Sequence, residues 1–545
     1  MASLEDPRRF GAGDCGVVSR DQATGVGPIL DLPMDWLEPS DDERVILALA
    51  RLRAKDREDY RGPVIFNPGG PGGSGVWSLV DHGKYIQSIV GTNFDIVTFD
   101  PRGVGASVPR IECWETEQAR SLWNLQAPGT IDSHPGVLSD VFARASAFSQ
   151  TCERTLDKSG ILRHSATASH AADLLQITKE LGEEKIKFWG FSYGTILAGA
   201  FAAMYPERVD RIVSDGNVDY REWFLREHIN FLQDTDKVMD AFYELCIEAG
   251  PVQCLMYDKN PVSIRRRIEA ILEDLQKNPI VVAPSDEGPL LPQLITFSKI
   301  KAFISTSLYR PFHTFELLAK VLAVAEKRDG RALYEIFKPG DMLSLCAVET
   351  VPPTVPPDTL NEGTADVFSA VLCADTPQMN DTLDDFAEYA EAVQKMSYSA
   401  GAVNAVNRMG CVSRHIRPKW RVAGPFNANT SYPILFVNNI ADNITPLISA
   451  RNNSQSFPGS IVLIQNSYGH TSLSTPSTCT ARAIRAYFQN GTLPQSDSVC
   501  EPDGRPFSLP APRIVESQGD EITLAVQELS RKATFEFQAR LHGLL

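Results

Sequence analysis

A serine, an aspartate and a histidine of this sequence have the types and the chain order of a hydrolytic triad. The serine is Ser192, at the centre of the pentapeptide GFSYG at 190–194. The apolar run KIKFW precedes this pentapeptide, and the small-residue segment TILAGAFAAMYP follows it. The sequence therefore predicts a nucleophilic serine on a tight turn between a strand and a helix, where flanking glycines avoid steric clashes. The alternative interpretation is a structural glycine turn with an ordinary serine.

The general base should be a histidine late in the chain, because this arrangement runs serine, acid, histidine. The chain has nine histidines, and His470 lies in SYGHTSL, on a predicted loop directly after the apolar run GSIVLIQN. His415 lies among arginine and lysine residues, and His542 lies in the C-terminal tail. We therefore expect His470 to be the base.

The acid should follow the strand that precedes the histidine. Asp442 does so, in YPILFVNNIADNITP, and would hold the tautomer of the imidazole and stabilise its protonated form. The rival is Asp215, in RIVSDGNVD after an earlier apolar run, whose alternative role is that of a helix cap or turn residue. The position of Asp442 directly after the strand that precedes His470 favours Asp442.

A glycine-rich loop, NPGGPGGSG at 67–75, follows the apolar run PVIFN. It supplies a candidate oxyanion hole, in which the N–H of Gly70 would act together with the N–H of Tyr193, since Pro71 has no N–H to donate. Glycine-rich loops also bind phosphate, but the chain contains no GK[ST] and no GxGxxG with a following acidic residue in a βαβ unit.

Short apolar runs alternate with helical patterns in both terminal parts of the chain. The predicted helices include 166–182 and 480–491, and the predicted strands lie at 63–67, 94–99, 185–190, 208–216, 432–439 and 459–466. This alternation predicts an α/β class with a mostly parallel central sheet, interrupted by a large inserted helical cap. Together with the turn of Ser192 and the order serine, acid, histidine, it predicts the α/β-hydrolase fold. The expected units are an N-terminal core part at 1–216, the cap at 217–425, a C-terminal core part at 426–505 and a tail with one helix at 506–545.

The composition excludes several classes of protein. The chain has 545 residues and a formal net charge of −16, with no basic patch of the kind that binds nucleic acid. No apolar stretch is long enough for a transmembrane helix, so no membrane partner is expected. No cysteine and histidine cluster has metal-ligand spacing, and we expect neither a metal nor a cofactor.

Cysteines and sequons leave the compartment open. The N-terminus lacks the features of a secretory signal, which predicts a cytoplasmic protein. Ten cysteines, of which Cys246 with Cys254 and Cys479 with Cys500 lie at distances that could close modest loops, favour the secreted alternative. The five N-x-[ST] sequons, which only a secreted chain would use, start at Asn380, Asn429, Asn443, Asn452 and Asn490.

The separated motifs GGPGGSG, FDIVTFDPRGVGAS, GFSYGT, RVDRIVSDGNVD, ILFVNNIADNITPL and SYGHTSL resemble the tripeptidyl-aminopeptidase-like branch of the α/β hydrolases. Prolyl iminopeptidases are more distant relatives. The resemblance extends from about Leu32 to Asp503 and covers most of the chain. In one departure, Asn443 stands where proline is common, and in another, no export signal is evident although family members are typically exported.

The resemblance implies a hydrolytic triad and a set of supporting residues. The triad would be Ser192, Asp442 and His470, with the Gly69–Gly70 loop as oxyanion hole. The segment TCTARAIRAYFQNGTLPQSDSVCEPD resembles the C-terminal module of the family, in which Cys479 and Cys500 would pair when the protein is secreted.

The favoured function is a serine hydrolase of aminopeptidase type that cleaves short units from peptide N-termini through an acyl-enzyme. An acidic group of the cap would then hold the α-ammonium of the substrate, and Asp219 and Glu222 are candidates. The alternative is an ester, amide or thioester hydrolase acting on a small molecule in fungal specialised-metabolite biosynthesis. A third hypothesis, a non-catalytic binding protein, conflicts with the intact triad. The oligomeric state is not readable from the sequence.

Overall fold

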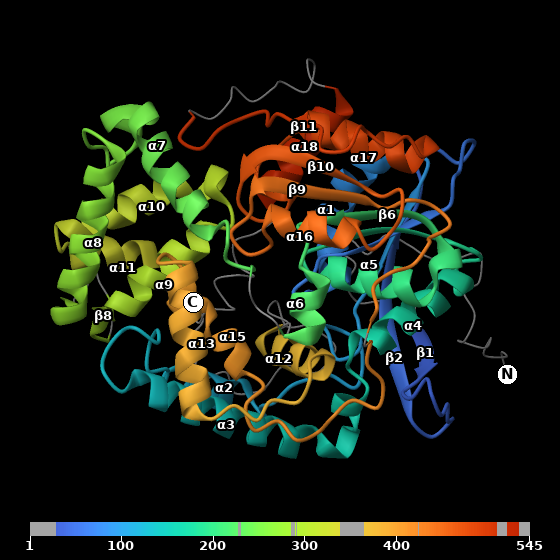
Figure 1. Cartoon of the computed structure of the whole chain (residues 1–545), viewed down its shortest axis with the longest axis horizontal. Helices are drawn as coiled ribbons and strands as arrows, with labels where there is room; N and C mark the ends of the chain where they lie inside the picture. Colours follow the sequence, from blue (N-terminus) through green and yellow to red (C-terminus); the bar gives the residue numbers. More distant parts are fainter. Residues whose placement is uncertain are drawn as a thin grey trace, which may run out of the picture.

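A long, mostly parallel sheet forms the centre of the computed structural model (Figure 1). The structure describes residues 29–226, 230–284, 289, 291–337, 364–422, 424–508 and 520–532. Within these residues the sheet has nine strands in the order β1-β2-β4-β3-β5-β6-β9-β10-β11. The strands are β1 (Ile29–Pro33), β2 (Arg44–Leu52), β3 (Pro63–Asn67), β4 (Asp95–Phe99), β5 (Ile186–Phe191), β6 (Val209–Asp215), β9 (Leu435–Ala441), β10 (Ile461–Tyr468) and β11 (Val499–Cys500).

The parallel part of the sheet consists of the strands from β4 to β11, and β1 and β2 add an antiparallel edge. All six predicted strands are present as β3, β4, β5, β6, β9 and β10. The residues of β3 and β4 are all buried, as expected where helices cover both faces of a parallel sheet. The fold class predicted from the sequence is therefore confirmed.

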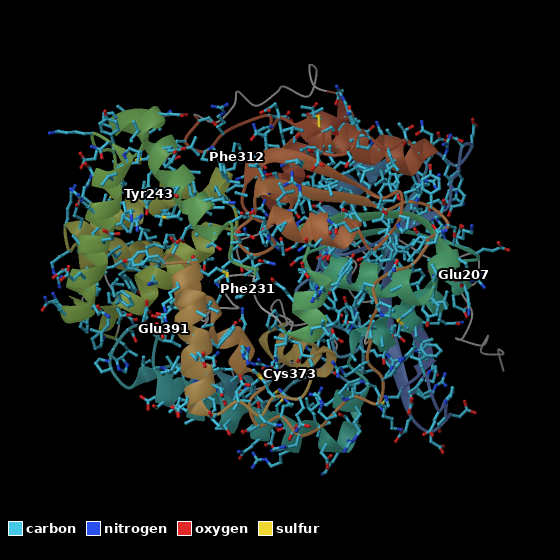
Figure 2. All side chains as sticks on the ribbon, in the orientation of Figure 1. Glu207, Phe231, Tyr243, Phe312, Cys373 and Glu391 are labelled. Carbon is cyan, nitrogen blue, oxygen red and sulfur yellow. A yellow bond between two sulfur atoms is a disulfide. The ribbon has the colours of Figure 1, made fainter. Side chains whose placement is uncertain are left out.

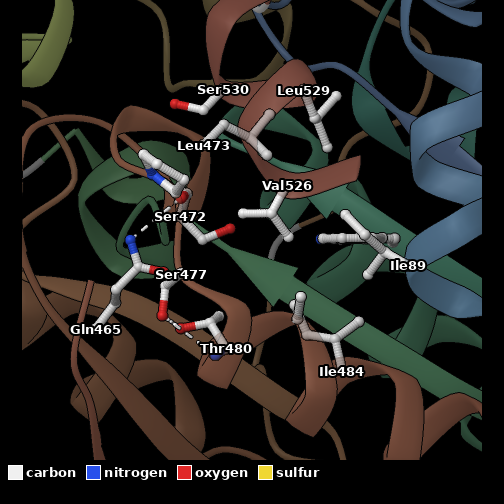
Figure 3. A pocket seen from close by; sticks show the side chains of 13 residues that line it. Ile89, Gln465, Ser472, Leu473, Ser477, Thr480, Ile484, Val526, Leu529 and Ser530 are labelled. Carbon is white, nitrogen blue, oxygen red and sulfur yellow. Dashed lines mark hydrogen bonds between the residues drawn. The ribbon is translucent and has the colours of Figure 1, made fainter. Parts of the chain in front are cut away.

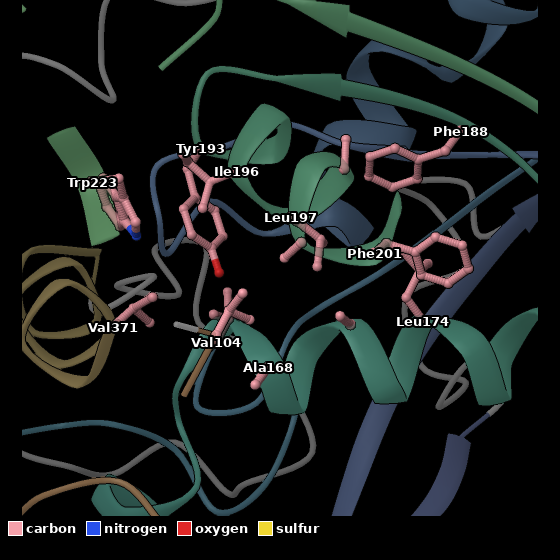
Figure 4. Close-up of a cluster of buried hydrophobic side chains, with 14 of the residues drawn as sticks. Val104, Ala168, Leu174, Phe188, Tyr193, Ile196, Leu197, Phe201, Trp223 and Val371 are labelled. Atoms are coloured by element: carbon pink, nitrogen blue, oxygen red, sulfur yellow. The ribbon is translucent and has the colours of Figure 1, made fainter. Parts of the chain in front are cut away.

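Two layers of helices cover the sheet. On one face lie α1 (Gly75–Val90), α17 (Thr478–Asn490) and α18 (Glu521–Lys532), which contact one another. On the other lie α4 (Thr167–Glu180), α5 (Tyr193–Met204) and α16 (Leu447–Ser454). Successive residues of a strand serve opposite faces: Phe66 packs with Trp189 on the α1 side, and Ile65 packs with Phe188 on the α5 side. Figure 4 shows part of the apolar cluster on the α5 side of the sheet, including side chains between α4 and α5.

The chain between β6 and β9, here called the cap segment, is mostly helical and has an apolar core of its own around Phe242, Phe315 and Leu318. Figure 1 shows α7, α8, α10 and α11 gathered at one side of the sheet. Its helices are α6 (Tyr220–Leu225), α7 (Thr235–Gln253), α8 (Pro261–Lys277), α9 (Phe297–Ser307), α10 (Pro311–Glu326), α11 (Gly330–Phe337), α12 (Thr364–Asp375), α13 (Leu383–Met396), α14 (Gly401–Asn404) and α15 (Val406–Met409).

Further elements were not expected from the sequence. Within the cap segment, β7 (Ile280–Val282) and β8 (Gln293–Ile295) pair as a short antiparallel ribbon. Earlier in the chain than the cap segment, α2 (Glu117–Asn124) and α3 (Val137–Leu156) lie between β4 and α4 in the sequence. α3 contacts α13 and α15 of the cap segment. The described part of the predicted tail helix is α18.

Among the described residues, eight cysteines form four disulfides. Figure 2 labels one of these cysteines, Cys373. The pairs are Cys113–Cys152, Cys246–Cys254, Cys373–Cys411 and Cys479–Cys500. The pair implied by the family resemblance, Cys479–Cys500, is present, and it joins α17 to β11. Cys15 and Cys346 lie outside the described residues. Cross-links of this kind restrict the unfolded chain and so stabilise the fold.

Among the described residues, no helix is long and apolar enough to cross a membrane. The same part of the chain contains no group of three or more histidine, cysteine, aspartate or glutamate side chains arranged to hold a metal ion.

Candidate active site

The candidate site lies at the carboxyl edge of the parallel strands, where ligand sites of such sheets form. Each functional side chain ends or follows a different strand. Asn67 ends β3, Ser192 follows β5, Asp215 ends β6, Asp442 follows β9 and His470 follows β10. Because these strands run parallel, residues far apart in the sequence meet along one edge.

Ser192 occupies a strained turn between β5 and α5, with φ 54° and ψ −118°. This backbone conformation is uncommon for a residue with a side chain. The turn needs glycine on both sides. A Cβ atom on Gly190 would lie 2.3 Å from the Gly194 oxygen, and one on Gly194 would lie 2.9 Å from the Asn67 oxygen. The sequence GFSYG is thus explained by sterics, and the Ser192 side chain remains partly exposed.

Asp442 and His470 lie within hydrogen-bonding distance. Nδ1 of the His470 ring is 3.1 Å and 3.0 Å from the two carboxylate oxygens of Asp442. With Nδ1 turned to the carboxylate, the other ring nitrogen, Nε2, is the one that could accept a proton from a nucleophile. The backbone N–H of His470 donates to the Tyr309 oxygen at 2.8 Å, which fixes the loop from the side of the cap segment.

The Asp442 carboxylate is fully buried, and hydrogen bonds compensate for its burial. The backbone N–H groups of Ile444, Thr445 and Thr471 donate to it at 3.0, 2.9 and 2.9 Å. The hydroxyl of Thr445 adds a bond of 2.7 Å. Four donors besides the imidazole therefore fix the orientation of the carboxylate.

Asp215, the rival acid, contacts the loop of His470 but not its ring. Its carboxylate accepts hydrogen bonds from the backbone N–H and the hydroxyl of Ser472, at 2.8 and 2.5 Å, and from the Trp189 indole at 3.3 Å. Its backbone oxygen accepts the N–H of Ser192 at 3.0 Å. Asp215 thus links the turn of Ser192 to the loop of His470, a role different from the helix cap or turn residue expected from the sequence. Burial raises the pKa of Asp215 to about 6.

The glycine-rich loop contacts the nucleophile turn. A Cβ atom on Gly69 would lie 2.9 Å from the Ser192 Cβ and 3.2 Å from the Tyr193 nitrogen. The Gly69 N–H donates to the Asn67 side chain at 2.9 Å, so this N–H is already used. The next N–H along the loop is that of Gly70, whose φ is 119°. Gly70 and Tyr193 therefore stay the candidate oxyanion donors, and the Gly69 N–H is not one.

Two polar residues that hold this loop were missed by the sequence analysis. Asn67 binds Gly69, as described above, and Asp100 holds the far end of the loop. The buried Asp100 carboxylate accepts the Ser74 hydroxyl at 2.8 Å and the Val76 N–H at 3.0 Å. A polar residue that directly ends an apolar strand, as in PVIFN and FDIVTFD, is the sequence signal that could have identified both.

The candidate ligands for a substrate ammonium group have structural partners. Asp219 accepts the N–H groups of Arg221 and Glu222 at the start of α6 and the Asn452 amide at 2.9 Å. Glu222 is buried and accepts the N–H of Asn230. These contacts explain both acids as parts of the fold.

Asn443, the departure from the family pattern, is buried beside Asp442. Its backbone oxygen accepts the Thr235 hydroxyl at 2.6 Å, so the start of α7 is tied to the loop that carries the acid.

A small cavity lies between α17, α18 and the loop after His470 (Figure 3). Most of the side chains that line it are apolar, among them Ile89, Ile484, Val526 and Leu529. Ser192, Asp442 and His470 do not line this cavity, which is therefore a packing defect behind the histidine loop rather than a substrate site.

Comparison with known proteins assigns the family. Residues 62–251 match the model of the α/β hydrolase fold, and residues 396–500 match that of TAP-like proteins. The chain is 28% identical over 504 residues to tripeptidyl aminopeptidase of Streptomyces lividans, covering 87% of this chain and 83% of that protein. It is 26% identical over 481 residues to serine protease Hip1 of Mycobacterium tuberculosis, covering 86% of each.

A further relative carries an esterase name. Carboxylesterase B of Mycobacterium tuberculosis is 24% identical over 481 residues, covering 87% of this chain and 86% of that protein. All three alignments run through both core parts and the cap segment. The chain is therefore an α/β hydrolase with a TAP-like C-terminal part, and it is a peptidase-like serine hydrolase.

Proposed function

We propose that this enzyme removes short units from the N-termini of peptides through an acyl-enzyme formed on Ser192. The observation that carries the proposal is the hydrogen-bonded pair of His470 and Asp442, which lies at the same sheet edge as the strained turn of Ser192. The name of the Streptomyces relative, a tripeptidyl aminopeptidase, supports the choice of substrate.

In the proposed reaction, His470 Nε2 takes the proton of the Ser192 hydroxyl as its oxygen attacks the carbonyl carbon of the substrate. The negatively charged oxygen of the tetrahedral intermediate accepts hydrogen bonds from the backbone N–H groups of Gly70 and Tyr193. Protonated His470 then gives its proton to the leaving amine, and the C–N bond breaks. Water, activated by the same histidine, attacks the acyl-enzyme and restores Ser192.

We propose that the cap segment limits access to this site, so that only chain ends enter. It is inserted between β6 and β9, which are neighbours in the sheet and carry Asp215 and Asp442 at their ends. Tyr309, in the turn before α10, contacts the His470 ring edge-on, with ring centroids 5.6 Å apart. These contacts bring the cap segment against the ring of the proposed base, which supports its role in access.

A second candidate function is ester hydrolysis by the same groups, which the name of the carboxylesterase relative favours. The alternative of a hydrolase in specialised-metabolite biosynthesis gains no support from these relatives, and it is not proposed.

The test compares matched substrates on the purified chain. A tripeptidyl p-nitroanilide with a free N-terminus should be cleaved, and N-acetylation of the same compound should lower kcat/KM by about 100-fold or more, because the chain end is blocked. Equal cleavage of both compounds would contradict an exopeptidase. Turnover of p-nitrophenyl esters without any cleavage of peptide amides would favour the esterase. Ser192→Ala is the control and should abolish labelling by a fluorophosphonate probe.

A further inference from the structure

The residue after the nucleophile has a buried side chain that takes part in a polar network. Tyr193 extends from α5 toward α4 (Figure 4) and is 2% exposed. Its hydroxyl lies 2.8 Å from the Thr167 hydroxyl and 2.9 Å from Nδ1 of His170, both on α4. The backbone N–H of this same tyrosine is the proposed oxyanion donor.

The network ends at an aspartate of the cap segment. Asp375, the last residue of α12, is fully buried, and its carboxylate accepts the N–H and the hydroxyl of Thr167 at 2.7 and 2.5 Å. It also accepts the Trp223 indole, from α6, at 2.8 Å. The network therefore crosses from two cap helices through α4 to the helix that follows the nucleophile.

The direction of each hydrogen bond follows from the groups involved. Burial raises the pKa of Asp375 to about 6, so at pH 8 it is a carboxylate that only accepts. Thr167 must give its one hydroxyl proton to Asp375, and its oxygen can then only accept the proton of the Tyr193 hydroxyl. The Tyr193 oxygen in turn accepts the Nδ1 proton of His170.

The state of His170 agrees with this direction. Burial lowers the pKa of His170 to about 3, so the ring is neutral and carries one proton. That proton lies on Nδ1, which leaves Nε2 unprotonated. Nε2 is buried without a partner among the described residues. If the proton were on Nε2, its N–H would be buried and unsatisfied, so the tautomer protonated on Nδ1 is the favoured one. Every donor of the chain thus points toward Asp375.

We propose that Asp375 is a positioning residue for the oxyanion hole, which acts through Thr167 on Tyr193 and so on the Tyr193 backbone N–H. The inference rests on the proposed role of Ser192. It assigns to the cap segment a part in stabilising the transition state, in addition to limiting access. A small displacement of an oxyanion donor is costly, because the donor acts on charge that develops only in the transition state.

The decisive experiment is a matched pair at Thr167, measured with a tripeptidyl p-nitroanilide at pH 8. Thr167→Val removes the hydroxyl at nearly constant volume, and we expect kcat to fall by about tenfold with KM changed less than about twofold. Thr167→Ser keeps the hydroxyl and should restore kcat. A peptide aldehyde, which forms a tetrahedral adduct with the serine, should bind Thr167→Val more weakly by the same factor as kcat/KM.

Thr178→Val is the control, because it removes another buried hydroxyl of α4, which donates to the Leu174 oxygen at 2.8 Å and lies outside the path from Asp375 to Tyr193. It should keep kcat within about twofold, although it can lower the melting temperature. Tyr193→Phe should reproduce the loss seen in Thr167→Val, and the double variant should be no slower than either, since both interrupt one chain.

Three outcomes decide the inference. Thr167→Val and Tyr193→Phe with wild-type kcat, in an enzyme that turns over and labels with fluorophosphonate, would overturn it and leave the proposed function standing. A Thr178→Val loss equal to that of Thr167→Val would also overturn it, since the effect would then be one of general packing. A wild-type chain that neither labels nor turns over would refute the proposed function instead. If Thr167→Val does not fold, Tyr193→Phe decides, because it deletes a single oxygen.

Discussion

Two buried aspartates at the ends of neighbouring strands have different surroundings. Asp442 follows β9 and lies 3.0 Å from the His470 ring, whereas Asp215 ends β6 and binds Ser472, two residues further along the same loop. Asp442 is held by three backbone N–H groups and a hydroxyl, but Asp215 has one backbone N–H, one hydroxyl and a long indole bond. Asp442 is the one of these two carboxylates that has an imidazole directed at it, and for this reason we propose it as the triad acid.

The largest expected effect is that of Asp442→Asn. The amide keeps the shape of the side chain but cannot hold the Nδ1–H tautomer of His470, so kcat should fall by about 10,000-fold. The peptide-amide assay measures the loss, and circular dichroism checks that the variant is folded. Combination with Ser192→Ala should cost little more than Ser192→Ala alone, since triad members act as a unit. Additive losses would mean that the residues are grouped wrongly.

Asp215→Asn should have a much smaller effect, with kcat lowered by no more than about tenfold, because Asp215 supports the histidine loop without contacting the ring. The same assay, run side by side with Asp442→Asn, gives the comparison directly. If the two variants lost equal activity, the assignment of the triad acid to Asp442 would fail.

The hydroxyls that bind the two carboxylates offer a finer comparison. Thr445→Val removes a donor to Asp442 that also lies 3.0 Å from His470 Nδ1, and we expect kcat to fall by roughly tenfold. Ser472→Ala removes the corresponding donor to Asp215, and we expect a change in kcat of about threefold or less, with a loss of about 1–2 kcal/mol in unfolding free energy. Steady-state kinetics and urea titrations separate the two effects.

The smallest effect is a difference in the pH dependence of stability. Burial raises the pKa of Asp215 to about 6 from an unfolded value of 3.8, so the native state holds this proton more tightly than the unfolded state. The stability that protonated Asp215 contributes is complete below pH 3.8 and is lost as the pH rises to about 6, by up to about 3 kcal/mol.

Asp215→Asn removes this titration. The difference in melting temperature, variant minus wild type, should therefore be more positive at pH 7.5 than at pH 4.5. Calorimetry of both proteins at the two pH values measures it. A constant difference between the two proteins across this range would show that Asp215 titrates normally in the folded chain.

Much of the sheet could be predicted from the sequence because its central strands are short, continuous apolar runs that end in glycine or polar residues. β2 was missed, since its nine residues mostly alternate between buried and partly exposed positions and include Arg44 and Arg51. The ribbon of β7 and β8 was missed because each strand has only three residues.

The candidate reacting groups are easier to recognise in the sequence than the groups that hold them. Ser192, Asp442 and His470 stand in local patterns of strand and turn. Asp375 reaches Thr167 across 208 residues of chain, and no local pattern marks either residue. Hydrogen-bond partners of this kind arise only when separate elements pack together, so a single sequence does not reveal them.

The Cys373–Cys411 disulfide joins the end of α12 to the turn after α15. Cys373 lies two residues before Asp375 in the same helix. Dithiothreitol would cut this tether and give the last turn of α12 more freedom. Samples prepared with and without reductant would then differ in rate for reasons unrelated to the nucleophile. Expression in an oxidising host, with the thiol content titrated before each assay, gives kinetic constants that can be compared between laboratories.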